Sequence, residues 1–274
     1  MILLDTNQYD KVIKPLREVT INNLFARAVV ENHVTGSVYV DDIDAPTTFY
    51  VVHPYGMTLL FGTTENKDFN ANFAHYALNK DKFGQKQEWM QAYPQAWDST
   101  LKKLLGEHLI KSADNIVEKT GVVELNTRVN FKFNPQKYAD FKRKLPKPDF
   151  EICRTDSLIF EQMNGSVVPK SFWDNATDFE QKGAGFSLIY KHQLAATAFS
   201  SCVLDRQLEI GIETIPTYRG KGFAQYVCAA LIEFCLNNDF EPVWACRLEN
   251  IGSYKLAQIL GFEPTFTLPY YKLA

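Results

Sequence analysis

The sequence predicts an α/β protein of the α+β type, built as one large domain or two ordinary ones. Its 274 residues are enough for either arrangement. Segments with alternating apolar residues and segments with apolar residues at helical spacing follow one another along most of the chain. Hydrophobic residues make up 46% of the chain and charged residues 22%, which is typical of a globular protein with a sizeable core.

Composition also excludes several classes of protein. A net charge of −3 argues against a nucleic-acid-binding protein, which would carry a clear basic excess. No apolar run approaches the roughly 18 residues that a membrane-spanning helix needs, and the first residues lack the basic start and apolar core of a signal peptide. The five cysteines lie within apolar patterns and form no C-x-x-C pair. We therefore expect buried thiols in a reducing cytoplasm, with no disulfide framework, metal site or membrane partner.

The first half of the chain is predicted to mix helices and strands. Residues 1–35 show the spacing of two helices, and residues 47–62 that of a β-hairpin that turns at 53–56. The other elements expected in this half are strands over 36–42, 89–93 and 122–133 and helices over 69–79 and 96–110.

The second half follows a basic, proline-broken stretch over residues 142–148, which is predicted to be a solvated linker. We therefore expect domains over residues 1–145 and 149–274. The elements expected after the linker are strands over 150–153, 185–191 and 194–204, a helical turn or two over 158–163 and a helix over 172–182.

A strand, a glycine loop and a helix organise the last third of the chain. Apolar residues alternate over 208–214, which predicts a strand, and recur at helical spacing over 223–236. Between them, Gly220 and Gly222 let the backbone approach a ligand, while Arg219 and Lys221 add positive charge. The helix N-terminus contributes unpaired N–H donors and the positive end of its dipole. This combination favours an anion of the phosphate type.

Known phosphate-binding motifs narrow the choice of ligand. The dinucleotide fingerprint requires a third glycine where this chain has Gln225, and the GxxxxGK[ST] loop is absent. The pattern Arg-x-x-Gly-x-Ala, from Arg219 to Ala224, instead resembles the acetyl-coenzyme A (acetyl-CoA) loop of the GCN5-related N-acetyltransferase (GNAT) superfamily.

A second motif downstream supports the same resemblance. Residues 242–247 are predicted to form one strand, and Asn250 is a suitable N-cap for a helix that Gly261 ends. Asn250-x-x-Ser253 followed by Gly261-Phe262 is similar to the second GNAT signature, in which the Asn and Ser positions line the coenzyme A arm and Gly-Phe starts the last strand. More narrowly, the chain resembles acetyltransferases of the zwittermicin A resistance type at Ile212–Thr214, Tyr218–Gly222, Trp244-x-Cys246 and Asn250-x-x-Ser253.

The resemblance implies a GNAT acyl-CoA N-acyltransferase fold, with a mixed, mostly antiparallel sheet, over residues 149–274. The first half shows the element order of such a domain but has no Arg-x-x-Gly-x-Gly/Ala loop. We interpret it either as a second, degenerate GNAT-like domain or as an unrelated α+β domain. In both cases we expect it to wall the acceptor site or to form a homodimer.

The resemblance also implies acetyl-CoA as cosubstrate, without a metal. The pyrophosphate is expected at the glycine loop, and the pantetheine arm along the preceding strand. The residues expected to bind acetyl-CoA are Ile212, Thr214, Ile215, Arg219, Gly220, Lys221, Gly222, Phe223, Ala224, Asn250 and Ser253.

Acetyl transfer to an amine requires a general base and is helped by a proton donor for the leaving thiolate. Glu213 is our first choice of base and Glu209 the second, since they share one face of the strand; the alternative for each is a structural or solvent-facing carboxylate. Many relatives place a donor tyrosine where this chain has Ala257, so Tyr254, one turn earlier, is the expected acid. The other available tyrosines are Tyr218, Tyr270 and Tyr271.

These inferences lead to a cytoplasmic N-acetyltransferase. We expect it to transfer an acetyl group from acetyl-CoA to a primary amine of a small molecule, such as an antibiotic or a metabolite, by direct attack in a ternary complex. Two alternatives stay open: a catalytically weak or inactive acetyl-CoA sensor, and an enzyme that acetylates protein termini or lysines.

Overall fold

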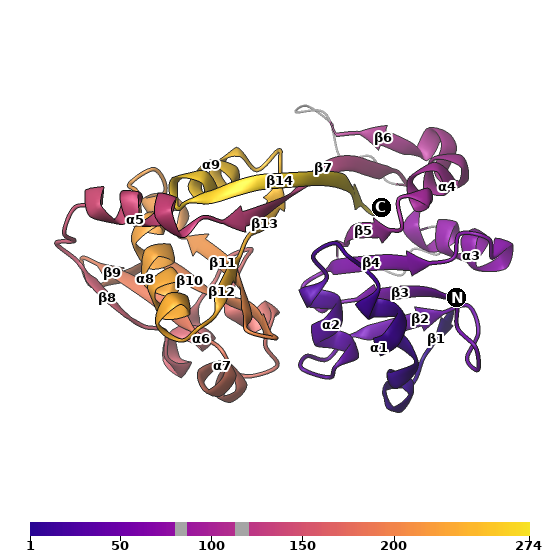
Figure 1. Cartoon of the computed structure of the whole chain (residues 1–274), viewed down its shortest axis with the longest axis horizontal. Coiled ribbons are helices and arrows are strands. Elements are labelled where there is room, and N and C mark those ends of the chain that lie inside the picture. The colour runs from indigo at the N-terminus through magenta and orange to yellow at the C-terminus, as the bar shows by residue number, and fades with distance from the viewer. Residues whose placement is uncertain (80–86, 113–120) are drawn as a thin grey trace. The chain divides into compact units, whose positions relative to one another are not determined.

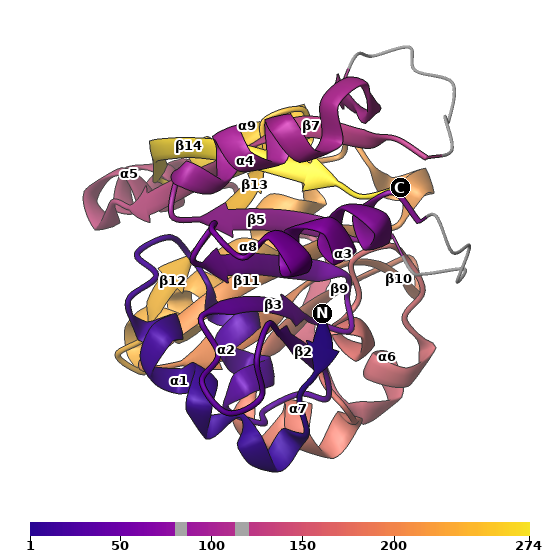
Figure 2. The same ribbon diagram turned by 90° about the vertical axis from the view of Figure 1, so that its right-hand side faces the viewer.

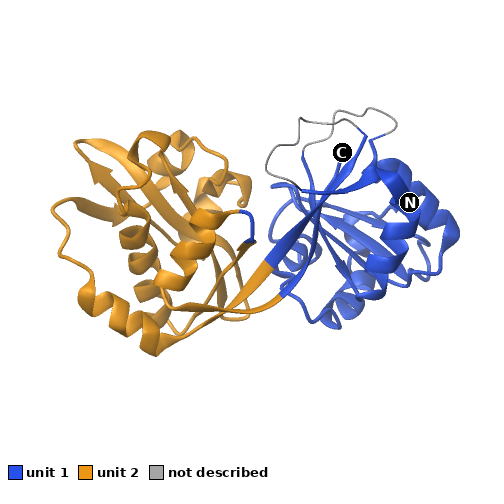
Figure 3. Cartoon of the chain, turned by 90° about the horizontal axis from the view of Figure 1, so that it is seen from above, with its two compact units in different colours: residues 1–128, 247–249, 267–274 blue, residues 129–246, 250–266 orange. Residues whose placement is uncertain are grey.

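The computed structural model describes residues 1–79, 87–112 and 121–274, and the chain divides into two compact units. Unit 1 comprises residues 1–128, 247–249 and 267–274, and unit 2 comprises residues 129–246 and 250–266. Two long strands, β7 (Val123–Phe133) and β14 (Phe262–Lys272), belong partly to each unit, as their change of colour shows (Figure 3). The units therefore interleave along the sequence, whereas the domain limits of 1–145 and 149–274, which stay a prediction, divide it once.

Unit 1 packs helices against a sheet that begins as an antiparallel meander. Strands β1 to β4 pair antiparallel in chain order, β5 runs parallel to β4, and β14 joins β5 (Figures 1 and 2). Tyr50 and Leu60 of the sheet share a core cluster with Phe73 and Trp97 of the helices. The elements before β7 are β1 (Ile2–Leu3), η1 (Thr6–Gln8), α1 (Asp10–Arg17), α2 (Leu24–Val30), β2 (Ser37–Val40), β3 (Thr48–Val52), β4 (Met57–Gly62), α3 (Lys67–Ala77), β5 (Trp89–Tyr93), α4 (Ala96–Leu105), η2 (Gly106–His108) and β6 (Leu109–Lys111).

These elements confirm the hairpin predicted over 47–62 and the strand over 89–93, but one helix was predicted too long. The helix expected over 96–110 ends at Leu105. Gly106 follows it with φ +51° and ψ −124°, a non-helical conformation that glycine adopts readily, so the helix ends there. The chain then turns into β6, which pairs parallel with β7, so the end of the predicted helix is a strand.

Unit 2 is built on a five-stranded sheet in the order β12-β11-β10-β9-β8. All neighbours in it are antiparallel except β11 and β12, which are parallel and connected through α8. The elements of this part of the chain are α5 (Pro135–Lys144), β8 (Glu151–Arg154), α6 (Ser157–Gln162), η3 (Pro169–Ser171), α7 (Ala176–Lys182), β9 (Gly185–Tyr190), β10 (Gln193–Leu204), β11 (Gln207–Thr214), η4 (Pro216–Tyr218), α8 (Phe223–Asn237), β12 (Glu241–Val243), β13 (Ala245–Arg247) and α9 (Ile251–Ile259).

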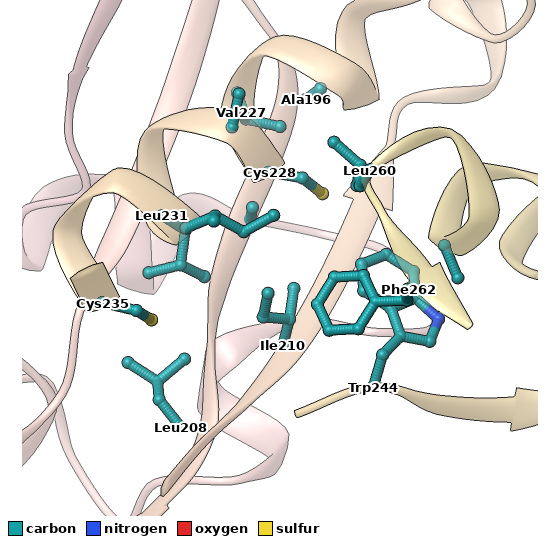
Figure 4. Close-up of a cluster of buried hydrophobic side chains, with 14 of the residues drawn as sticks. Ala196, Leu208, Ile210, Val227, Cys228, Leu231, Cys235, Trp244, Leu260 and Phe262 are labelled. Carbon is teal, nitrogen blue, oxygen red and sulfur yellow. The ribbon is translucent and has the colours of Figure 1, made fainter. Parts of the chain in front are cut away.

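The core of unit 2 lies between α8 and one face of this sheet. Leu231 and Cys235 of α8 are fully buried near Leu208 and Ile210 of β11, with Trp244 and Phe262 beside them (Figure 4). Burial raises the pKa of the Cys235 thiol to about 12. This residue is therefore an apolar core group rather than a nucleophile, as its place in an apolar pattern predicts. Side chains of the five-stranded sheet that do not belong to this core lie on the face of the sheet opposite α8.

Three predictions for unit 2 need correction. The linker expected over 142–148 is shorter, because residues 142–144 form the last turn of a helix, α5, that begins at Pro135, and only 145–148 lie outside helices and strands. The Asn134 side chain caps α5 by accepting from the Lys137 N–H at 3.1 Å, and the buried Tyr138 hydroxyl donates to Glu233 Oε1 of α8 at 2.7 Å. The helix therefore docks on unit 2 through a tyrosine, despite its basic surface.

The second error concerns the strand expected over 242–247. It is two strands: β12 pairs with β11, and β13 pairs with β7. The break comes at Trp244, whose side chain is 2% exposed and belongs to the core cluster. The helix predicted over 172–182 is also shorter, since it begins at Ala176 after the capping Asn175.

Candidate active site

The glycine loop has the geometry of an anion-binding helix N-terminus. Gly220 and Gly222 both have φ +79°, a left-handed conformation that glycine adopts without strain. A Cβ atom at either position would meet nothing within 4 Å, so backbone conformation rather than crowding requires these glycines. Gly222 is the N-cap of α8 and has no side chain to accept from the first N–H groups of the helix. Those donors therefore remain available to a ligand.

The strand that leads into the loop has an open edge. β11 pairs with β12 only from Gln207 to Glu209. Beyond Glu209, β12 ends and the chain continues as β13 in the other sheet, so in the described part of the chain the remaining residues of β11 pair only with β10. Free backbone N–H and C=O groups on such an edge can pair with an extended polar chain. This edge runs from Ile210 to Thr214, toward the glycine loop.

The two basic side chains of the loop are held in different ways. Arg219 Nε donates to Thr214 O at 3.0 Å, and its terminal nitrogen donates to Glu213 Oε1 at 3.1 Å. Lys221 Nζ lies over the ring of Tyr218 at 5.2 Å and over that of Tyr190 at 5.7 Å. Arg219 thus fastens the loop to the end of β11, while Lys221 is kept beside the loop by cation–π contacts.

Glu213 is surrounded by hydrogen-bond donors. Besides Arg219, its carboxylate accepts from Ser166 N at 2.9 Å, Ser166 Oγ at 3.1 Å and Val167 N at 3.0 Å, all through Oε2. The residue is 5% exposed. An acceptor amine would therefore have to compete for this carboxylate with four hydrogen bonds already in place, three at Oε2 and one at Oε1. Nothing in the sequence pattern around Ser166 identified this contact, because it joins segments far apart in the chain.

Glu209 lies where the two parallel strands separate. It is opposite Val243 in the last pair between β11 and β12, and opposite Cys202 beside a bulge in β10. Such bulges are frequent next to active sites. Glu209 and Glu213 share a face of β11, and four residues of strand place Glu209 about 13 Å farther from the glycine loop. Both carboxylates are therefore near the open edge, at its opposite ends.

The second signature forms the helix cap that the sequence predicts. Asn250 Oδ1 accepts from Ser253 N at 3.1 Å at the start of α9, and Ser253 Oγ accepts from Trp244 Nε1 at 3.2 Å. The ring of Tyr254 packs against Phe131, with centroids 5.5 Å apart. Among the described residues none forms a hydrogen bond with the Tyr254 hydroxyl. Ala257 is fully buried, so a core residue occupies the position at which many relatives have a donor tyrosine.

The other predicted tyrosines are engaged elsewhere. The Tyr218 hydroxyl donates to Gln193 Oε1 at 2.6 Å, and the Tyr271 hydroxyl to Asp98 Oδ1 at 3.0 Å. Tyr270 stacks on Trp89 in unit 1 and lies beneath Arg128. Tyr254 is thus the tyrosine of unit 2 with a hydroxyl that remains available close to the second signature.

Unit 1 has no comparable loop among its described residues. Its strand β5 pairs parallel with β4 along the whole length of β5, from Met57 with Trp89 to Phe61 with Tyr93. The helix that follows β4 is capped by the Asn66 side chain, which accepts from Phe69 N at 2.9 Å. A capped N-terminus followed by the acidic Asp68 is unsuited to a phosphate. The loop of unit 2 is therefore the site to compare with known proteins.

A family model described as GNAT acetyltransferase matches residues 14–271 of this sequence. The chain belongs to the GNAT acetyltransferase family. The match covers both halves of this GNAT acetyltransferase, so the first half is part of the family's common architecture rather than an unrelated addition.

Two solved structures and one curated protein are similar over most of this GNAT acetyltransferase. "Uncharacterized N-acetyltransferase YdfB" of Bacillus subtilis (strain 168) is 27% identical over 242 residues, covering 87% of this chain and 86% of the relative. A GCN5-related N-acetyltransferase-like protein from Streptococcus suis 89/1591 superposes with a TM-score of 0.72 at 21% identity, covering 98% and 99% of the two chains. A tandem GNAT protein from the clavulanic acid biosynthesis pathway gives 0.62 at 10% identity, covering 99% and 97%.

These findings establish the fold and the class of this GNAT acetyltransferase. It is an acyltransferase with a mixed α/β fold and two GNAT-like halves, as in the tandem structure. The narrower resemblance to zwittermicin A resistance enzymes stays a prediction. No helix among the described residues has the length and hydropathy required to cross a membrane.

The residues at the loop fit acetyl-CoA, which the GNAT family uses. The left-handed glycines and uncapped α8 N-terminus suit a pyrophosphate, and the open edge of β11 suits the amide groups of a pantetheine arm. Arg219 and Lys221 supply cations at the same end of the edge. Acetyl-CoA, when bound, supplies the acetyl thioester that reacts with the acceptor.

Proposed function

We propose that this GNAT acetyltransferase transfers the acetyl group of acetyl-CoA to a primary amine of a small molecule, by direct attack in a ternary complex in the cytoplasm. The observation that carries the proposal is the open edge of β11 ending at a glycine loop and an uncapped helix. This arrangement provides backbone donors for a pyrophosphate and for an extended amide chain in one continuous line.

Each part of that line has a proposed role in holding the cosubstrate. Backbone N–H groups from Gly220 to Ala224 bind the pyrophosphate, with Arg219 and Lys221 adding charge. Ile212 and Thr214 offer backbone groups to the pantetheine arm. Ile215, whose N–H donates to Ala195 O and whose carbonyl accepts from Tyr218 N, is proposed to contact the arm through its side chain. Asn250 and Ser253 lie at the N-terminus of α9 and contribute polar groups on the opposite side of the arm.

We propose Glu209 rather than Glu213 as the general base that takes a proton from the amine. Glu209 lies at the end of the edge farthest from the pyrophosphate loop, where the thioester end of an extended arm belongs. Glu213 lies at the other end of the edge, next to the glycine loop, and its oxygens accept from Ser166, Val167 and Arg219. We therefore assign Glu213 a role in positioning Arg219 and the segment around Ser166, and no role in proton transfer.

The Tyr254 hydroxyl is the proposed proton donor to the leaving thiolate. Packing of its ring against Phe131 fixes the side chain. A thiol of ordinary pKa is a fair leaving group without help, so this donor adds to the rate but is not required for it.

A small acceptor is favoured by the cover over the sheet face that carries Glu209 and Glu213. Phe172 of the segment after α6 packs on Phe199 of β10 at 5.6 Å, and Trp173 Nε1 donates to Ser200 O at 2.7 Å. Gly211 of β11 lies directly under the Phe199 ring. An extended peptide would have to displace this packed segment, whereas a small amine would not. An antibiotic or metabolite amine is therefore preferred to a protein substrate.

Calorimetric titration with acetyl-CoA tests the proposal. Gly222→Asp places a carboxylate at the N-cap of α8 and strains a backbone with φ +79°, so we expect acetyl-CoA affinity to fall by at least about tenfold. Gly121→Asp is the matched control, since Gly121 has φ +75° and nothing within 4 Å of an added Cβ, but lies in unit 1. Release of thiol in the presence of candidate amines would then identify the acceptor. Folded wild-type protein that fails to bind acetyl-CoA would refute the proposal.

A further inference from the structure

The Glu213 carboxylate joins two loops that are distant in the sequence of unit 2. One is the segment between α6 and η3, where Ser166 and Val167 donate three hydrogen bonds to Oε2. The other is the glycine loop, where Arg219 donates to Oε1. A single side chain of β11 therefore holds both loops.

The segment between α6 and η3 is shaped to receive this carboxylate. Gly165 has φ +156°, and a Cβ atom there would lie 2.8 Å from both Cγ and Oε2 of Glu213. Only glycine lets the backbone come this close, and the close approach is what presents the next two N–H groups to the carboxylate. Because Glu213 is 5% exposed, its carboxylate oxygens take their hydrogen bonds from these donors rather than from bulk water.

Arg219 receives its orientation from the same carboxylate. Its Nε donates to Thr214 O at 3.0 Å while its terminal nitrogen donates to Glu213, so two acceptors on β11 fix the plane of the guanidinium. The Arg219 side chain is 60% exposed, and a guanidinium has five N–H donors. Donors that β11 does not use are thus presented at the glycine loop in a fixed direction.

We propose that Glu213 is a positioning residue that couples the segment 164–167 to Arg219, so that this segment sets the affinity of the glycine loop for coenzyme A. This inference rests on the proposed function, because it takes the glycine loop as the phosphate site. Release of the segment frees the carboxylate to rotate, and Arg219 then loses its fixed direction. Linkage is reciprocal, so coenzyme A binding also stabilises the segment.

A double-mutant cycle tests the coupling, with coenzyme A affinity measured by calorimetry. Ser166→Ala removes one donor to Oε2 and is remote from the glycine loop in sequence. We expect it to weaken coenzyme A binding by about 3- to 10-fold in the wild-type background, and by less than about 2-fold in an Arg219→Ala background. The control is Ser171→Ala. Ser171 lies in η3, directly after the segment 164–167, and its replacement should leave the affinity for coenzyme A unchanged.

Amide hydrogen exchange provides a second measurement. If Ser166 had only a structural role, coenzyme A binding would not change its exchange rate. Coenzyme A should slow exchange of the Ser166 and Val167 amides in the wild type but not in Arg219→Ala. Wild-type protein that binds no coenzyme A would refute the proposed function itself. If the wild type binds, an equal effect of Ser166→Ala in both backgrounds, or none in either, would refute only the coupling. Glu213→Gln, which keeps the shape of the side chain, should weaken binding at least as much as Ser166→Ala.

Discussion

At the scale of single residues, Glu209 and Glu213 of β11 have different surroundings, and we propose different roles for them. They share a face of one strand, yet Glu213 lies among donors from two loops while Glu209 lies where β11 and β12 separate. Alternation along the strand predicted the shared face. It could not predict that the Glu213 carboxylate would accept four hydrogen bonds, because three of them come from Ser166 and Val167, which no local pattern connects with Glu213.

Replacing Glu209 tests its role as the base. Glu209→Gln keeps the shape of the side chain but cannot accept a proton from the amine, so kcat should fall by about 10²- to 10⁴-fold. The dissociation constant of acetyl-CoA should stay unchanged, since Glu209 is remote from the glycine loop. Steady-state kinetics and calorimetry measure the two quantities. Glu241→Gln at the exposed start of β12 is the control, and equal kcat values for the two variants would exclude Glu209 as the base.

At the scale of elements, local patterns predicted the site better than its surroundings. The strand over 208–214, the helix starting at Phe223, the Asn250 cap and the strand starting at Phe262 all have local signals, and all are present. The failures involve tertiary choices. The segment over 242–247 has the composition of one strand, but the core position of Trp244 divides it between two sheets.

Helix α5 was not predicted, because most of its residues are charged or polar and only one side chain anchors it to the rest of unit 2. Its last turn contains Lys142, Arg143 and Lys144, which are typical of a solvated stretch. The tertiary anchor is Tyr138, whose hydroxyl has two acceptors within hydrogen-bond distance, Glu233 Oε1 at 2.7 Å and the Ala229 carbonyl at 3.1 Å. One buried tyrosine in a basic segment was too weak a signal to predict the docking.

The contribution of this anchor can be measured. Tyr138→Phe keeps the ring but leaves the Ala229 carbonyl without this donor, so unfolding free energy should fall by about 1 kcal/mol. Urea denaturation followed by circular dichroism measures the change. Tyr226→Phe on α8 is the control, because its ring packs on Phe150 and its hydroxyl has no hydrogen bond within the described chain. A Tyr138→Phe variant as stable as this control would show that ring packing alone holds α5.

At the scale of the whole molecule, stability should depend on pH through a carboxyl group buried in unit 1. Glu88 is 7% exposed and accepts from the hydroxyls of Tyr50 and Tyr76. Burial raises the pKa of Glu88 above its usual value of 4.5, although the two tyrosine donors act in the opposite direction. The folded state therefore keeps this proton to a higher pH than the unfolded state does.

The sign of the effect follows from this difference. The stabilisation is complete below the unfolded pKa and is lost as pH rises through the raised folded pKa. Wild-type melting temperature should therefore fall, relative to that of Glu88→Gln, as pH increases from about 4 toward neutrality. Differential scanning calorimetry of both proteins over this range measures it. A constant difference between the two would mean that Glu88 has the same pKa in both states.

Interleaving of the units makes a further prediction about the whole molecule. A chain cut after residue 145, at the predicted domain limit, lacks β14, which pairs with β5 at Tyr271 and Met90. It also lacks residues 247–249 of unit 1. We expect such a chain to show no cooperative melting transition by circular dichroism and to aggregate on size exclusion, unlike the full chain. A monomeric fragment with a cooperative transition would show that unit 1 folds without these segments.

The same interleaving has a consequence for how the protein is made. During synthesis the N-terminal part of a multidomain chain usually folds first, while the rest is still being added. Here residues 267–274 of unit 1 leave the ribosome only after every residue of unit 2 has been translated. Unit 1, which begins the chain, therefore cannot finish folding until all residues of unit 2, which contains the glycine loop, have been synthesised. Until then β5 exposes an unpaired edge, and a chaperone that shields strand edges would be most useful to this protein at that stage.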